Sequence, residues 1–190
     1  MDSYWSSTYS DCEPISYRLR DQYRNRWIRF HTLPNSKRYA DNEAEYRIIL
    51  DRHNAILSEL AISNDQLVFA STGYSETPQP TRDEYPQLNA FDKDAKCWRT
   101  ISKHELDNDT SPNYWHLYMS NWFWTPGVFD SIFRLVADNV IANTMILSTS
   151  NHWIYHPYDG GADVVLPSSA ERAKLKRKFN SWLSTRSDGL

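Results

Sequence analysis

Residues 152–167 constrain the fold most, because they read as two apolar runs on either side of the turn signal at 159–161. Asp-Gly and Gly-Gly between apolar runs are the strongest short-range indication of a β-hairpin, since glycine tolerates the positive φ of tight turns. Ser168 followed by Glu171 has the form of a capping box, so a helix begins at once. The stretch predicts strand, turn, strand and helix, and we expect this unit to close the core.

Hydrophobic periodicity predicts the other elements. Residues 27–33 alternate, which predicts a strand that Pro34 ends. Apolar residues from Tyr46 to Leu60 recur at three- and four-residue steps, which predicts a helix capped by Asn42 and Glu45. Strands are also expected at 67–72, 97–101, 114–124 and 144–148, and helices at 15–23, after Thr125-Pro126 and from Ser168 to Leu183.

The order of these elements predicts the fold class. Strands outnumber helices and often follow each other directly, which favours an α+β domain with a mainly antiparallel sheet and about three helices packed on one face. A chain of 190 residues buries enough surface to fold without disulfide bonds or a structural metal. We expect an N-terminal arm at 1–14, ordered only if Trp5 or Tyr9 docks, and one domain over 15–190 with loop insertions at 76–94 and 107–112.

Composition excludes several classes of protein. A net charge of −3 argues against nucleic acid as the main partner. There is no apolar run of membrane-spanning length and no signal-peptide pattern at the N-terminus. Cys12 and Cys97 lie far apart without metal or redox spacing. We therefore expect a soluble protein of the reducing cytoplasm without cofactors, with a disulfide between these cysteines as the alternative.

Four residues around the expected hairpin are candidates for chemistry: His152, His156, Asp159 and Asp163. In an extended strand the two histidines would lie about 13–14 Å apart, which is too far for one zinc ion without a bend. We interpret the aspartates as turn and strand-edge residues and expect no metal site. A metal or acid–base site is the alternative.

A second candidate is the polar face of the strand at 27–33. Arg29 and His31 share this face with Trp27, and Lys37 and Arg38 follow the strand. Together they would form a small cationic pocket for a carboxylate or phosphate, since arginine offers a planar fork and lysine a point charge. The simpler interpretation is that these basic side chains form a solvated edge near Glu43 and Glu45, at the start of the next helix.

Other chemical signals are weak. The nucleophile motif Gly-x-Ser-x-Gly, the P-loop and the Gly-x-Gly-x-x-Gly fingerprint are absent. Arg99 would lower the pKa of the nearby Cys97 thiol, although a buried strand cysteine is commoner. His53 lies on an apolar helix face and is interpreted as a core residue. His116 alternates with tyrosines, as on the floor of a pocket or on a half-buried sheet face.

Two segments resemble a family of uncharacterised bacterial proteins that carry a domain of unknown function. The first is Trp-Ile-Arg-Phe-His-Thr-Leu-Pro-Asn-Ser-Lys-Arg-Tyr at 27–39, followed by the helix at 42–60. The second is Tyr-His-Pro-Tyr-Asp-Gly-Gly-Ala-Asp-Val at 155–164, which is similar to a hairpin near the C-termini of these proteins. The resemblance covers most of residues 16–185. It implies a bacterial cytosolic origin and supplies no catalytic residues.

The leading interpretation is a non-catalytic cytosolic binding protein, and most specifically an immunity-type inhibitor that neutralises a partner toxin. A small, mildly acidic, aromatic-rich single domain is typical of such proteins. Surface aromatics and an acidic loop at Asp107–Asp109 would then meet a protein partner. The binding residues expected on this interpretation are Trp27, Lys37, Arg38, Asp107, Asp109, Trp122 and Tyr158.

The alternative interpretation is a hydrolytic enzyme or small-molecule-binding protein with a site on the polar sheet face. It requires that distant side chains converge in one pocket and that at least one has a shifted pKa. A third possibility is a module that dimerises through exposed aromatics, since the sequence leaves the oligomeric state open. The residues of the alternative site are Arg29, His31, His116, His156, Asp159 and Asp163.

Overall fold

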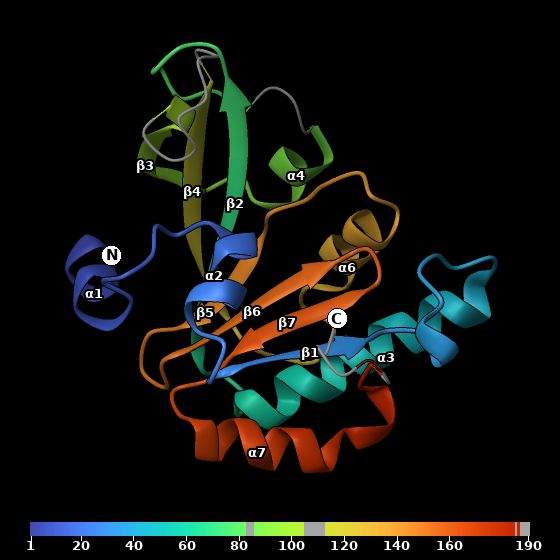
Figure 1. Cartoon of the computed structure of the whole chain (residues 1–190). Coiled ribbons are helices and arrows are strands. Elements are labelled where there is room, and N and C mark those ends of the chain that lie inside the picture. The colour runs from blue at the N-terminus through green and yellow to red at the C-terminus, as the bar shows by residue number, and fades with distance from the viewer. Residues whose placement is uncertain (83–85, 105–112, 185, 187–190) are drawn as a thin grey trace.

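A computed structural model of the chain describes residues 1–82, 86–104, 113–184 and 186. Its centre is a seven-stranded sheet in the order β1-β7-β6-β5-β2-β4-β3, in which every pair of neighbours is antiparallel (Figure 1). The expected α+β class with an antiparallel sheet is confirmed. The strands are β1 (Trp27–His31), β2 (Gln66–Ser75), β3 (Lys96–Ser102), β4 (Tyr114–Phe123), β5 (Met145–Ser148), β6 (Trp153–Tyr158) and β7 (Gly161–Val165).

Helices cover both faces of the sheet, whereas the sequence predicted helices on one face only. The α3/α6 face packs against α3 (Glu43–Leu60), α4 (Pro86–Phe91), α6 (Asp130–Ala137) and α7 (Ser169–Lys178). The α1/α2 face packs against α1 (Asp2–Thr8) and α2 (Ser16–Gln22). Two short 3-10 helices, η1 (Pro34–Ser36) and η2 (Asn180–Trp182), complete the described elements.

The N-terminal segment is ordered because its aromatic side chains dock on the α1/α2 face. Trp5 and Tyr9 are both fully buried. The Trp5 indole donates to the carbonyl of Cys12 (2.7 Å), and the Tyr9 hydroxyl donates to the carbonyl of His152 (2.9 Å). The N-terminal arm was expected to be ordered only if Trp5 or Tyr9 docks, and both of them do. The arm also contains the helix α1, which no periodicity in the sequence had indicated.

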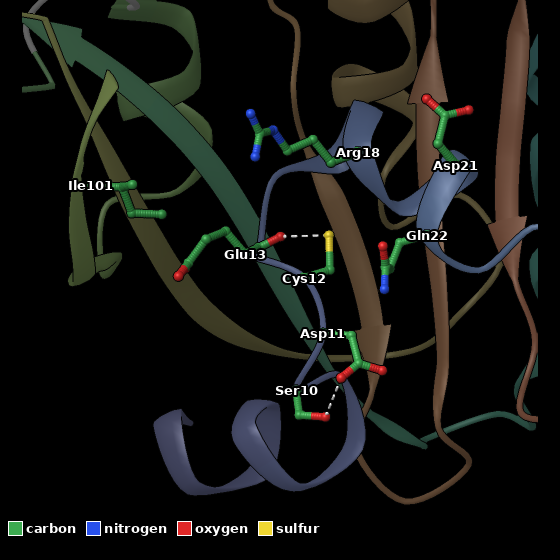
Figure 2. A pocket seen from close by; sticks show the side chains of 8 residues that line it. All are labelled: Ser10, Asp11, Cys12, Glu13, Arg18, Asp21, Gln22 and Ile101. Carbon is green, nitrogen blue, oxygen red and sulfur yellow. Dashed lines mark hydrogen bonds between the residues drawn. The ribbon is translucent and has the colours of Figure 1, made fainter. Parts of the chain in front are cut away.

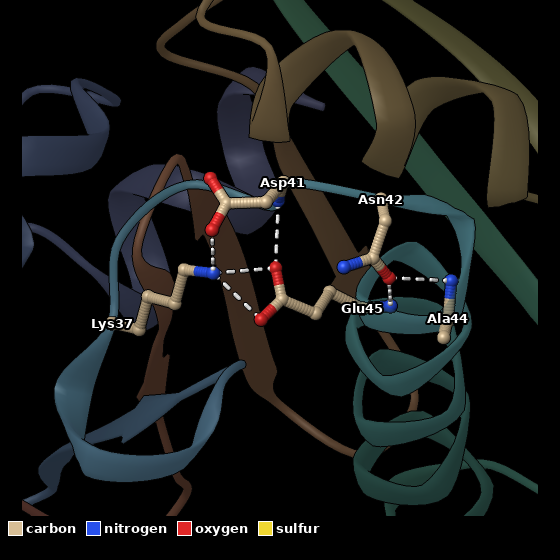
Figure 3. A network of polar contacts seen from close by, with 5 residues as sticks. All are labelled: Lys37, Asp41, Asn42, Ala44 and Glu45. Atoms are coloured by element: carbon tan, nitrogen blue, oxygen red, sulfur yellow. Dashed lines mark hydrogen bonds and ion pairs between the residues drawn. The ribbon is translucent and has the colours of Figure 1, made fainter.

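Local signals place the ends of two helices correctly. The side chain of Asn42 accepts hydrogen bonds from the backbone N–H groups of Ala44 and Glu45 and so caps α3 (Figure 3). The carboxylate of Glu45 accepts from the backbone N–H of Asp41, one residue earlier than a capping box requires. Ser168 caps α7 by accepting from the N–H of Glu171 (3.2 Å).

Two local predictions were wrong. The helix expected after Thr125-Pro126 begins only at Asp130, because turns occupy the intervening residues and Gly127 has a φ of +89°. The excursion at 76–94 was expected to be irregular, but it contains α4, which packs Leu88 into the main core. The insertion expected at 107–112 lies outside the described residues.

The β6–β7 hairpin forms as expected, with Tyr158 opposite Gly161 and two residues between them. Its glycines serve a different purpose from the one predicted, since neither adopts positive φ. A Cβ on Gly161 would lie 2.0 Å from the carbonyl oxygen of Phe30 on β1, a distance that van der Waals packing forbids. Glycine at this position therefore lets the hairpin approach β1.

Gly161→Ala should destabilise the protein by several kcal/mol, because either the hairpin or β1 must move to relieve the clash. Gly160→Ala is the matched control, since a Cβ there meets side-chain atoms and no backbone, with the Tyr158 ring at 3.2 Å, and needs a shift of only a few tenths of an ångström. Urea unfolding followed by circular dichroism measures both variants. Equal stability of the two would contradict the close-approach explanation.

Candidate functional site

Three polar residues form a row across β1, β7 and β6 on the α1/α2 face. Arg29 lies opposite Asp163, and Asp163 lies opposite His156. The guanidinium of Arg29 donates to both carboxylate oxygens of Asp163, from Nε at 2.7 Å and from Nη2 at 2.8 Å. Both side chains are largely buried, so this bidentate pair satisfies two charges that are removed from water.

Aromatic rings enclose the guanidinium of Arg29. Its Cζ lies 4.6 Å from the ring centroid of Tyr158 and 5.6 Å from that of Trp27, within the range of cation–π attraction. Burial raises the pKa of the Tyr158 hydroxyl, and the nearby Arg29 opposes that shift. Tyr158 therefore stays neutral and contributes a ring face to the row.

The imidazole of His156 is buried and oriented by the main chain. Its Nδ1 lies 2.8 Å from the carbonyl oxygen of Thr144, so Nδ1 carries the proton and donates. Burial lowers the pKa of His156, while the carboxylate of Asp163 acts in the opposite direction. The ring is therefore a neutral imidazole with a fixed tautomer near neutral pH.

At the turn of the hairpin, Asp159 holds two exposed side chains in place. Its Oδ2 accepts from Arg38 Nε (2.8 Å) and from the Tyr39 hydroxyl (3.0 Å). Asp159 is 8% exposed, whereas Tyr39 is 48% exposed and the Arg38 side chain 64%. The hydrogen bond to Asp159 raises the pKa of both partners. A buried carboxylate thus fixes a cation and an aromatic ring at the surface.

A cavity of about 140 Å³ lies beside this turn. It is bounded by β6 and by the chain that follows α6. The volume suits one side chain of a partner or a very small ligand. Its lining residues are Arg38, Val136, Asn139, Ile141, Ala142, Asn143, His156, Pro157, Tyr158 and Asp159.

His116 belongs to a different part of the molecule. His116 is on β4, opposite Gly73 on β2. Strand alternation places its side chain on the α3/α6 face, away from Arg29. Its Nε2 lies 2.7 Å from Ser75 Oγ and its Nδ1 lies 2.9 Å from Thr100 Oγ1. The six residues of the alternative enzyme site therefore do not converge in one pocket.

The cationic pocket is not formed either, because carboxylates already pair its cations. Lys37 Nζ lies 2.6 Å from the carboxylates of both Asp41 and Glu45. Figure 3 shows how the two carboxylates surround this ammonium group. Arg29 and Arg38 are paired as described above. Burial, followed by the charge of Arg29, lowers the pKa of His31, so this imidazole adds no cation near neutral pH.

Two of the remaining residues expected to bind a partner, Trp27 and Trp122, are not part of the hairpin turn. Trp27 is buried in the core of the α1/α2 face and cannot reach a partner in the folded state. Trp122 is half-buried and stacks on Phe91 with ring centroids 4.6 Å apart. Asp107 and Asp109 lie outside the described residues.

A larger cavity of about 550 Å³ separates the N-terminal segment from α2 and β3, and Figure 2 shows the side chains around it. The side chains around this cavity are poorly suited to catalysis. Burial raises the pKa of the Cys12 thiol to about 11, which keeps it protonated. The carboxylate of Glu13 is already paired with Arg99 (2.9 Å). We therefore place the candidate site at the hairpin turn.

The described part of the chain also lacks clustered metal ligands, disulfide bonds and membrane-spanning helices. Within it, no group of three or more His, Cys, Asp or Glu side chains is arranged to hold a metal ion. Cys12 and Cys97 are both free. None of the helices described has the length and apolar character to cross a membrane.

Sequence reasoning missed two contributors to the site. Tyr39 was noted only as part of a motif, yet it binds Asp159 from 120 positions away. Thr144 was assigned to a strand, but its carbonyl fixes the tautomer of His156. The Arg-Tyr pair that follows β1 was the available signal for Tyr39, whereas a backbone carbonyl leaves no signal in a sequence.

Comparison with known proteins assigns the chain to a family. Residues 15–187 match the family described as Domain of unknown function (DUF3885), so the chain belongs to that family. This match covers β1, the hairpin and every residue of the candidate site. No curated protein and no solved structure matches the chain.

Removing one partner of the Arg29–Asp163 ion pair should destabilise the protein more than replacing both partners. Asp163→Asn should lower the free energy of unfolding by about 3–5 kcal/mol, because the Arg29 charge stays buried without its carboxylate. The double variant Arg29→Met with Asp163→Leu should recover much of that loss. Asp21→Asn, which breaks an exposed pair with Arg20, should cost less than about 1 kcal/mol. Equal losses in the buried and exposed pairs, from urea unfolding curves, would contradict this assignment.

Proposed function

We propose that this chain is a non-catalytic cytoplasmic binding protein that docks on a partner protein through its hairpin surface. The hairpin surface comprises Arg38, Tyr39, Val140 and the small cavity beside Asp159. One observation carries the proposal: the buried carboxylate of Asp159 holds an arginine and a tyrosine side chain that are both exposed.

The groups around the turn favour binding over catalysis. A general base or nucleophile needs a reactive atom with a matched pKa and access to substrate. Here Arg29 and Asp163 are bound to each other, and Asp159 is bound to Arg38. His156 is buried and neutral, and His116 lies on the other face of the sheet. The arrangement rigidifies the hairpin and offers no assembled catalytic set.

The exposed groups suit a protein partner. Arginine and tyrosine are over-represented among the residues that dominate protein–protein binding. Because Asp159 already orients both side chains, less rotamer entropy is lost when a partner binds. Val140, which is 40% exposed, lies between the cavity-lining residues Asn139 and Ile141 and adds an apolar contact.

Within this class we propose an immunity-type inhibitor that neutralises a toxin encoded beside it. Such a protein needs a rigid, preformed surface and no turnover, and a partner side chain would enter the cavity of about 140 Å³. A net charge of −3 favours encounter with a basic partner. Asp107 and Asp109 contribute two of the negative charges in this total.

The product of the adjacent gene is the partner to test. Calorimetric titration should give a stoichiometric complex, and co-expression of this chain should restore the growth that the gene product arrests. Arg38→Ala and Tyr39→Ala should each weaken binding at least tenfold, because each removes a preoriented contact.

Two control variants separate binding from catalysis. Arg20→Ala removes an arginine from α2, outside the hairpin surface, and should leave affinity unchanged. His116→Gln, on the other face of the sheet, should keep both binding and protection, whereas an enzyme that depends on this imidazole would lose protection. Absence of a complex, or equal binding by Arg38→Ala and the unmodified chain, would contradict the proposal.

A further inference from the structure

The small cavity beside the hairpin turn has two hydrogen-bond acceptors in its wall, and the first is Nε2 of His156. Because Nδ1 of this ring donates to the carbonyl of Thr144, Nε2 carries no proton and can only accept. Nε2 has no hydrogen-bond partner among the described residues, and it is not one of the polar atoms sealed inside the protein. His156 lines the cavity and is 8% exposed, so the accessible part of its ring faces the cavity.

The second acceptor is Oδ1 of Asp159. Oδ2 accepts from both Arg38 and Tyr39, whereas Oδ1 accepts no hydrogen bond from the part of the chain that the structure describes. Asp159 also lines the cavity and is 8% exposed. A ligand that displaces water from a buried acceptor loses affinity unless it replaces the hydrogen bond. A group that enters this cavity must therefore bring donors.

The charges around the cavity disfavour an ionic ligand. Asp159 is paired with Arg38, and Asp163, which lies opposite His156 on β7, is paired with Arg29. Since these charges already balance, a cation that entered would be a buried charge without a counter-ion. An anion such as a carboxylate brings no donor to either acceptor and would lie beside the carboxylate of Asp159. An uncharged donor is therefore favoured.

Among uncharged groups, a primary carboxamide matches the cavity best. Its NH2 group offers two donors for the two acceptors, whereas a hydroxyl offers one. Its carbonyl oxygen needs a donor, and the guanidinium of Arg38 has N–H groups beyond those that bind Asp159. The buried side chains of Val136 and Ile141, together with Pro157, form an apolar wall for the methylene groups that precede the amide.

We propose that this cavity binds a primary carboxamide, the side chain of an asparagine or glutamine of the partner protein, which donates its N–H groups to His156 Nε2 and Asp159 Oδ1. That the amide belongs to a partner rests on the docking proposed for the hairpin surface, whereas the carboxamide site is a property of this chain alone. The cavity then selects among partners, because aspartate, glutamate or lysine at the same place is rejected.

Acetamide and acetate test the site on the full chain without any partner, because the two molecules have nearly the same shape and differ in their donors. NMR of nitrogen-labelled histidine follows Nε2 of His156 directly. Acetamide should shift this resonance saturably, with a dissociation constant in the millimolar range, as expected for so small a ligand. Acetate and methylammonium at the same concentrations should leave the resonance unchanged.

Two variants locate the binding. His156→Phe keeps a ring in place but removes the acceptor, and should weaken acetamide binding at least tenfold, followed by the backbone amide of Tyr158. Ala142→Trp, at an exposed position in the cavity wall, should block entry and leave both acceptors intact. The matched control is Ala90→Trp, which lines a different cavity and should bind acetamide as the unmodified chain does. Circular dichroism checks that each variant is folded.

Three results overturn the carboxamide site: no saturable shift with acetamide, acetate or methylammonium binding as tightly as acetamide, or unchanged acetamide binding in folded His156→Phe. These results are separate from the test of docking. If the adjacent gene product binds but acetamide does not, the hairpin surface stands and the carboxamide site fails. If acetamide binds but the gene product does not, the site stands and the assignment of the partner fails.

Discussion

The buried ion pair between Arg29 and Asp163 is the interaction on which the rest of the structure depends. Two charges removed from water are tolerated only because the bidentate geometry satisfies both. The pair also fixes register, since a slip of one residue would turn Asp163 to the opposite face of β7. With the hairpin held against β1, Asp159 comes within reach of Arg38 and Tyr39. The hairpin surface is therefore a consequence of this pair.

Side chains occupy main-chain groups along the β1 edge of the sheet, which is the end that carries the hairpin surface. On the β1 edge, Arg172 donates to the carbonyl of Trp27 and Arg52 to the carbonyl of His31. These side chains occupy acceptors that would otherwise attract another strand. Near the other edge of the sheet, residues 90–94 border the last part of β4, with Phe91 stacked on Trp122. The surface available for binding at the β1 end is therefore made of side chains, among them Arg38 and Tyr39.

Much of the fold could be predicted because its signals are local. The turn at 159–161 and the caps Asn42 and Ser168 depend on residues a few positions apart. The missed features depend on distant partners. Arg29 and Asp163 are 134 positions apart, and Tyr9 binds the carbonyl of His152 across 143. A single sequence does not show which of several charged residues will meet. The cationic pocket was expected for this reason, whereas the structure gives each of these arginines and lysines a carboxylate.

Native-state hydrogen exchange tests most directly whether the hairpin and β1 form one unit. The account predicts that the amides of Phe30 on β1 and Val164 on β7 exchange only by global unfolding, with an opening free energy equal to the free energy of unfolding measured by urea. The result that would contradict it is exchange of these amides by local opening, at a clearly lower free energy, while the amides of β2 and β4 stay protected.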